Sequence, residues 1–144
     1  MATIKSLARK MRKLNLKPLK IEAVRKQTKL FEDIQKQQLR QGLNSKAETL
    51  TPSYPKGYAG FKGTLSTYHA PLGVPDLYLK GGFARGIMMK ITGMRYDFFS
   101  TDSKSDKLTK KYGKPIWGIA PFNMPRVQAA SMLELRQLIA KKLS

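Results

Sequence analysis

The 144-residue sequence contains no cysteine, one histidine (His69) and only nine acidic residues. Without cysteine the chain can form no disulfide, no thiolate metal site and no cysteine nucleophile, and its redox compartment stays undetermined. His69 lies in a segment flanked by proline and glycine, where no sequence neighbour supplies a second metal ligand. A structural or solvated role is therefore the expectation for this residue.

Motifs of catalysis are also absent: H-E-x-x-H, G-x-S-x-G and G-x-x-x-x-G-K-[ST] do not occur. The one local cluster of acids, Asp97, Asp102 and Asp106, alternates with lysines. A general acid/base pair needs an apolar setting that raises one pKa, so capping and surface ion pairs explain these acids better. We expect no catalytic residue, no metal site, no cofactor and no enzymatic activity.

Long apolar runs are missing as well. No run approaches the roughly 20 residues that cross a bilayer, so we expect no membrane span. The N-terminus lacks the continuous apolar core of a secretory signal.

Positive charge is what the sequence has in excess, with 28 Lys and Arg and a formal net charge of +19. Residues 1–40 carry 12 basic and three acidic residues, so the charge is concentrated, though not confined, there. Such a field implies an acidic partner: nucleic acid, an anionic membrane surface or an acidic protein face.

The first 17 residues form a basic N-terminal arm or helix, in which Ile4, Leu7, Met11 and Leu14 fall on one stripe at helical spacing. Three interpretations stay open. The helix docks on the body or on a partner subunit with its basic face in solvent, it lies along nucleic acid, or it is a transit peptide or membrane-surface helix.

Residues 18–144 are predicted to form a single α+β domain. Pro18 breaks the first helix, and a longer helix follows, ended by a left-handed cap at Gly42. One face of this helix is expected to hold Ile21, Val24, Thr28, Phe31, Ile34 and Gln38. Residues 43–75 are rich in proline, glycine and tyrosine and predict an extended loop with little regular structure. Such a long connection is usually functional or ordered by a partner.

The second half predicts a β-hairpin and two helices. Strand formers fill Gly86–Thr92 and Met94–Ser100, joined near Gly93. A short helix follows, capped by Asp102 or Ser103 and ended by Gly113. A C-terminal helix opens at Asn123 and Pro125 and runs to about Leu143. Its inner stripe is expected to hold Val127, Met132, Leu135, Ile139 and Leu143.

The stretch LYLKGGFARG, residues 77–86, places three glycines between aromatic and basic residues. A phosphate-cradling loop would lie between a strand and a helix and continue into Ser or Thr, and neither context holds. We interpret the stretch as a turn or helical step that leads into the hairpin. Packing anchors are predicted at Leu77, Tyr78, Phe83, Tyr112 and Trp117.

Nucleic-acid contacts would be to phosphates and independent of base sequence, because no zinc spacing or ribonucleoprotein motif occurs. Aromatics interleave with Lys and Arg at 54–68 and 77–85, a pattern compatible with stacking on single strands but more often with core filling. The candidate contacts for phosphates or an acidic partner are Arg9, Lys10, Arg12, Lys13, Lys17, Lys20, Arg25, Lys80 and Arg85.

Three blocks, in this order, resemble small structural proteins of tailed bacteriophages, of the neck, head-completion and tail-terminator type. They are QQLRQGLNSKAETLTPSY (Gln37–Tyr54), PDLYLKGGFARGI (Pro75–Ile87) and STDSKSDKLTKKYGKPIWGI (Ser100–Ile119). The resemblance implies a virion protein, assembled in the host bacterial cytoplasm, that forms a homo-oligomeric ring in the head–tail connector. It implies portal, neck or tail proteins as partners, with non-specific contact to packaged DNA.

Two other functions remain open. One is a sequence-neutral basic nucleic-acid-binding protein of ribosomal or nucleoid type, in which residues of the first two helices grip phosphates. The other is an organellar protein with a cleavable basic leader, whose mature chain would begin near Leu19.

Overall fold

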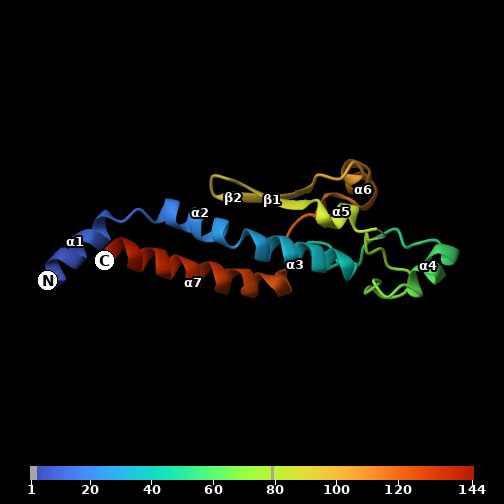
Figure 1. Ribbon diagram of the computed structural model, residues 1–144, viewed down its shortest axis with the longest axis horizontal. Coiled ribbons are helices and arrows are strands. Elements are labelled where there is room, and N and C mark those ends of the chain that lie inside the picture. Colours follow the sequence, from blue (N-terminus) through green and yellow to red (C-terminus); the bar gives the residue numbers. More distant parts are fainter. Residues whose placement is uncertain (1–2, 79) are drawn as a thin grey trace.

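The computed structural model describes residues 3–78 and 80–144, and its α+β fold confirms the predicted class. Seven helices and one two-stranded antiparallel sheet form an elongated molecule (Figure 1). The helices are α1 (Ile4–Lys13), α2 (Leu16–Lys26), α3 (Thr28–Arg40), α4 (Lys56–Gly63), α5 (Gly82–Arg85), α6 (Ser105–Tyr112) and α7 (Met124–Leu143), and the strands are β1 (Ile87–Thr92) and β2 (Arg95–Ser100). Two 3₁₀ turns, η1 (Lys114–Ile116) and η2 (Pro121–Asn123), lead into α7.

The first three helices follow one another nearly in line, and α7 runs back along α2, so that both termini lie at the same end (Figure 1). The break between α1 and α2 comes at Leu14–Asn15 rather than at Pro18. Asn15 caps α2 by accepting a hydrogen bond from the Lys17 N–H at 3.1 Å. Pro18 is the third residue of α2, where its missing N–H breaks no helical hydrogen bond.

The long helix predicted after Pro18 is in fact two, because the chain turns once at Gln27. The hydroxyl of Thr28 donates to the carbonyl of Arg25 at 2.6 Å, and such local bonds compete with the helical ladder. The predicted face survives the break: Phe31 and Ile34 are buried on it, and α3 ends at a left-handed Gly42 with φ +79°. An added Cβ at Gly42 would collide with Val74.

The hairpin packs on α3, which supplies the support that a two-stranded sheet lacks alone. Ile87 and Met89 are buried on the inner face of β1, and Phe98 is buried on β2. Phe31 meets Tyr96 edge to face with ring centroids 5.2 Å apart. The sheet is therefore held to α3 by a shared aromatic and aliphatic core.

The 43–75 segment was expected to have little regular structure, and it contains one eight-residue helix, α4. Two other local expectations were wrong. The N-cap of α6 is Lys104, whose N–H donates to Asp102 Oδ1 at 2.8 Å in the turn ahead of the helix. Met132 is 50% exposed, because the face of α7 toward α2 passes through Leu135 and Ile139 and leaves Met132 outside.

Two fully buried glutamines of α3 attach the helix to the segment that precedes α7. The Gln35 amide donates to the carbonyl of Ile116 at 2.9 Å and accepts from the Gly118 N–H at 2.7 Å. Gln38 donates to the Gly118 carbonyl at 2.9 Å and accepts from the Ala120 N–H at 2.8 Å. These side chains satisfy backbone groups that no sheet or helix serves.

Replacing Gln38 by Ala should lower the free energy of unfolding by about 2–4 kcal/mol, because it leaves the buried Ala120 N–H and the half-buried Gly118 carbonyl without partners. The matched control is Gln37→Ala, an exposed position on the same helix, which should change it by no more than about 0.5 kcal/mol. Urea unfolding followed by circular dichroism measures both. Equal small losses would show that the amide pairs contribute nothing.

Candidate functional site

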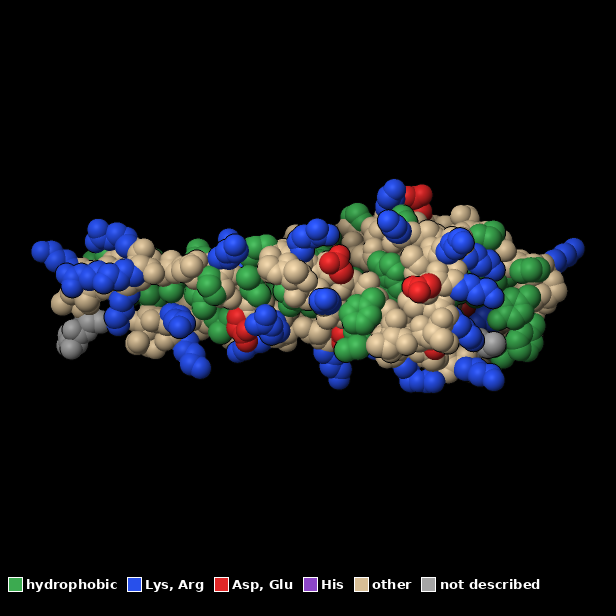
Figure 2. All heavy atoms as spheres, turned by 90° about the horizontal axis from the view of Figure 1, so that it is seen from above, with side chains coloured by type: hydrophobic (Ala, Val, Ile, Leu, Met, Phe, Trp, Pro, Cys, Tyr) green, Lys and Arg blue, Asp and Glu red, His purple; other side chains and the backbone are tan. Residues whose placement is uncertain are grey.

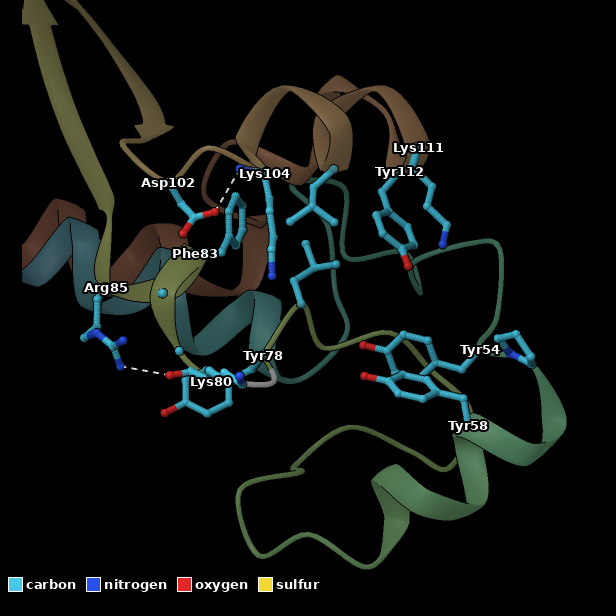
Figure 3. Close-up of a pocket in the computed structure, with 15 residues that line it drawn as sticks. Tyr54, Tyr58, Tyr78, Lys80, Phe83, Arg85, Asp102, Lys104, Lys111 and Tyr112 are labelled. Carbon is cyan, nitrogen blue, oxygen red and sulfur yellow. Dashed lines mark hydrogen bonds between the residues drawn. The ribbon is translucent and has the colours of Figure 1, made fainter.

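A half-open cleft of about 650 Å³ is bordered by α4, α5 and α6. Figure 3 shows its aromatic and basic lining. Tyrosines and basic residues line it together with the apolar side chains of Leu77, Phe83 and Leu108, which we call its floor. The tyrosine and basic side chains that line the cleft are Tyr54, Tyr58, Tyr78, Tyr112, Lys80, Arg85, Lys104 and Lys111.

A buried ion pair holds one wall of the cleft. The Lys62 ammonium lies 2.9 Å from Asp76 Oδ1, and both side chains are fully buried. The ammonium also donates to the carbonyl of Tyr78, and the hydroxyl of Tyr54 donates to Asp76 Oδ1 at 2.9 Å. This network ties α4 to residues 76–78 and fixes Tyr54 at the edge of the cleft.

The rings of Tyr54 and Tyr68 complete the setting of this lysine. The Lys62 ammonium lies 5.9 Å from the centroid of Tyr54 and 5.6 Å from that of Tyr68, within reach of a cation–π attraction. A buried charge is tolerated when it is paired and hydrogen-bonded, and Lys62 meets both conditions.

Three phenol groups of the cleft, those of Tyr54, Tyr58 and Tyr112, have a raised pKa and stay protonated at neutral pH. Burial, followed by the negative charge of Asp76, raises the pKa of both Tyr58 and Tyr112 above the usual value. The pKa of Tyr54 is raised further, chiefly by burial. Figure 3 shows the hydroxyl ends of Tyr54, Tyr58 and Tyr112 directed toward the cleft. The cleft therefore presents neutral hydroxyls beside its cations.

Two residues in the left-handed conformation, Leu77 and Gly81, determine the path of the backbone at the opening of the cleft. Leu77 has φ +52°, a left-handed conformation that is rare for a residue with a branched side chain. Gly81 has φ +82°, and an added Cβ there would meet the Arg85 guanidinium at 2.7 Å. The guanidinium in turn donates to the Lys80 carbonyl at 3.0 Å, which closes a tight turn ahead of α5.

The nine predicted contact residues fall into two groups in opposite halves of the elongated molecule (Figure 1). Lys80 and Arg85 line the cleft, and the other seven lie on α1 and α2. All nine are exposed. Arg25 is paired with Glu22 at 2.8 Å, and Lys10 donates to the Leu143 carbonyl at 3.4 Å. Figure 2 shows further lysines and arginines spread along the length of the molecule.

The five predicted packing anchors surround the floor of the cleft. Leu77 and Phe83 belong to the hydrophobic core, and Tyr112 and Trp117 are half-buried against it. The ring of Trp117 lies 5.6 Å from Phe83, and its N–H donates to Thr109 at 3.1 Å. Tyr78 is half-buried under the guanidinium of Arg40, 4.5 Å from the ring centroid.

Sequence reasoning missed the Lys62–Asp76 ion pair and two of the lysines that line the cleft, Lys104 and Lys111. Lys62 and Asp76 are 14 positions apart in a segment predicted to be a loop, so no helical or strand spacing joins them. Lys104 and Lys111 lie at the two ends of the predicted short helix and were not among the predicted contact residues. The usable signal was the interleaving of aromatic and basic residues at 54–68 and 77–85.

Other kinds of site find no support in the part of the chain that the structure describes. No cluster of three or more His, Asp or Glu side chains is arranged to hold a metal ion there. His69 is exposed beside a shallow hollow that also borders Asp33 and Arg40. None of the described helices is both long enough and apolar enough to cross a membrane.

Comparison of this chain with known protein families, with curated proteins and with solved structures finds no match.

Replacing Lys62 by Met should lower the free energy of unfolding by about 3–5 kcal/mol, because the carboxylate of Asp76 is left buried without its cation. The double variant Lys62→Met/Asp76→Asn should regain part of this loss, since the amide is uncharged and keeps an acceptor for Tyr54. Lys56→Met, an exposed change on the same helix, is the control. Denaturant unfolding of all three tests the pair. A double variant no more stable than Lys62→Met would contradict it.

Stability should fall above pH 10 in a way that depends on Tyr54. Its pKa is raised in the folded chain, so the stability it adds is complete below the unfolded value near 10 and is lost as pH rises toward the folded value. Tyr54→Phe removes this titration. Its unfolding free energy, measured between about pH 9 and 11, should decline less steeply than that of the wild type. Parallel declines would exclude the effect.

Proposed function

We propose that this protein is a non-enzymatic structural subunit of the bacteriophage head–tail connector, in the neck or tail-terminator position. It assembles in the host cytoplasm into a homo-oligomeric ring and joins portal or capsid to tail in the virion. The three sequence blocks that resemble such proteins span residues 37–119. In the fold they correspond to the end of α3, the entry to the hairpin and α6 with its exit.

The observation that carries this proposal is the solvent exposure of the apolar residues of α1. This ten-residue helix has no buried residue, although Ile4, Leu7 and Met11 form an apolar stripe along it. Ile4 is 89% exposed and Met11 56%. A helix this short is marginal in water unless a face of it packs against something. An apolar stripe that a single chain leaves open is what a subunit of a larger assembly needs.

Charge gives the proposal its second support. The basic face of α1, at Lys5, Arg9, Arg12 and Lys13, surrounds the apolar stripe. An interface partner with a matching acidic rim would be attracted and oriented by this field. Residues of the same field that face away from the partner would be free to contact phosphates of packaged DNA.

A sequence-neutral nucleic-acid-binding function is the second candidate. The exposed cations of α1 and α2, with few acids among them, favour it. The two functions differ in the role of the apolar stripe of α1, because contacts to phosphates alone would leave this stripe uncovered.

Light scattering coupled to size-exclusion chromatography at moderate salt should show a closed oligomer. Replacing Ile4 and Met11 by Gln should dissociate it to monomers, because the stripe is lost without a change in charge. The matched control, Lys5→Gln/Arg12→Gln, changes the basic face of the same helix and should leave most of the assembly in place. A wild-type monomer that neither self-associates nor binds portal, and whose nucleic-acid binding vanishes as salt rises, would overturn the connector proposal in favour of the second candidate.

A further inference from the structure

The cleft between α4, α5 and α6 carries an excess of positive charge that the described protein does not neutralise. Lys80, Arg85, Lys104 and Lys111 line it, against one acid, Asp102. An oxygen of that acid already accepts the Lys104 N–H. Within residues 3–78 and 80–144 none of the four cations forms an ion pair. A concave surface of one charge sign concentrates ligands of the opposite sign, so the cleft selects an anion.

The rest of the lining is apolar and aromatic. A simple inorganic anion would gain no binding energy from contact with these side chains. Leu77 and Phe83 form buried floor, and the half-buried rings of Tyr58 and Tyr112 stand at the sides. Planar bases stack on such rings regardless of their identity. The volume of about 650 Å³ lies within the range of small-molecule pockets, about 300–1,000 Å³, and is large enough for one or two nucleotides.

The geometry favours a single strand over a duplex or a peptide. In a duplex the bases are paired and stacked within the helix, so their faces cannot reach the rings of a cleft. Acidic peptides are commonly recognised along a sheet edge or by clustered arginine forks. Here no residue of β1 or β2 lines the cleft, and three of its four cations are lysines, which suit phosphates as point charges.

The cleft is also held in shape before any ligand binds. The Lys62–Asp76 pair fixes the Tyr54 wall, and the turn at Gly81 is closed by the bond from Arg85 to the Lys80 carbonyl. Figure 3 shows the Lys104 side chain extending from α6 toward the hollow. Little ordering is needed on binding, which favours affinity.

We propose that this cleft binds single-stranded nucleic acid, with the rings of Tyr58 and Tyr112 against one or two unpaired bases and with Lys80, Lys104 and Lys111 on the flanking phosphates. This site is separate from the basic residues of α1 and α2, and its occupation does not depend on assembly into a ring.

Fluorescence anisotropy with a labelled oligothymidine of about 12 nucleotides tests the site on the full chain. Lys104→Ala/Lys111→Ala should weaken binding about tenfold and make the salt dependence shallower by about 1.4 in the log–log slope, for two lost phosphate contacts. The control Lys141→Ala/Lys142→Ala removes the same charge from two exposed residues in the last turn of α7, away from the cleft, and should weaken binding no more than about threefold. Equal losses in the two variants would overturn the site, because a general field would then explain binding.

Stacking is tested at constant charge. Tyr58→Leu should weaken oligothymidine binding at least about fivefold, whereas Tyr58→Phe, which keeps the ring, should bind nearly as the wild type does. Thermal unfolding shows whether each variant is folded. Emission of Trp117, the only tryptophan, reports changes beside Phe83, which lines the cleft, and in Lys104→Ala/Lys111→Ala the emission change should require about tenfold more oligothymidine than in the wild type.

Two competitors decide the class of ligand. A duplex of the same length and sequence composition should compete at least about tenfold less well than the single strand, and polyglutamate of equal charge should compete poorly. A duplex that competes equally, or polyglutamate that displaces the oligonucleotide, would overturn the proposal and assign the cleft to duplex phosphates or to an acidic protein. Oligomeric state, measured in parallel, keeps this outcome distinct from that of the connector proposal.

Discussion

The structure depends on α3, and in particular on two amides that lie where apolar side chains would be expected. Gln35 and Gln38 are fully buried, and each bonds both a carbonyl and an N–H of the 116–120 backbone. That segment is irregular, so without the amides its polar groups would be buried and unpaired. With them, the chain can cross α3, turn at Pro121 and return as α7 along α2. The same helix carries the hairpin on its apolar face.

The end of the molecule that contains α4 is held by a second buried polar contact, just as the 116–120 segment is held by the two amides. Residues 43–78 contain one short helix, and most of their backbone has no regular hydrogen-bond partner. Lys62 and Asp76 join that helix to the return of the loop, and Tyr54 and the Tyr78 carbonyl complete the network. Removing two charges from water is costly, so the pair adds more to the geometry of this wall than to net stability.

The sequence was informative where one local pattern decides the structure. Alternating strand formers around Gly93 gave the hairpin and its inner face, and the left-handed Gly42 gave the end of α3. It failed where a distant contact decides. One such case is α4, which an ion pair across 14 positions joins to residues 76–78. The break at Gln27 is a different case, because the Thr28 hydroxyl bond beside it is local and the apolar periodicity does not reveal it. The interleaved aromatic and basic residues at 54–68 and 77–85 indicated part of the cleft. Its lysines from the α6 region come close to those residues only in the folded chain.

The two ends of the molecule therefore differ in how much of their structure the single chain completes. The cleft end is fixed by a buried ion pair and by the exposed hydrogen bond that closes the turn at Gly81, so the proposed ligand would meet a surface that is already formed. The α1 end has an apolar stripe and a basic face but no buried residue, so its own chain stabilises this helix little. The proposed ligand of the first end would bind through complementarity of charge and aromatic rings. The proposed partner of the second end would also supply free energy that stabilises the helix. The elongated α2–α7 pair separates the two surfaces.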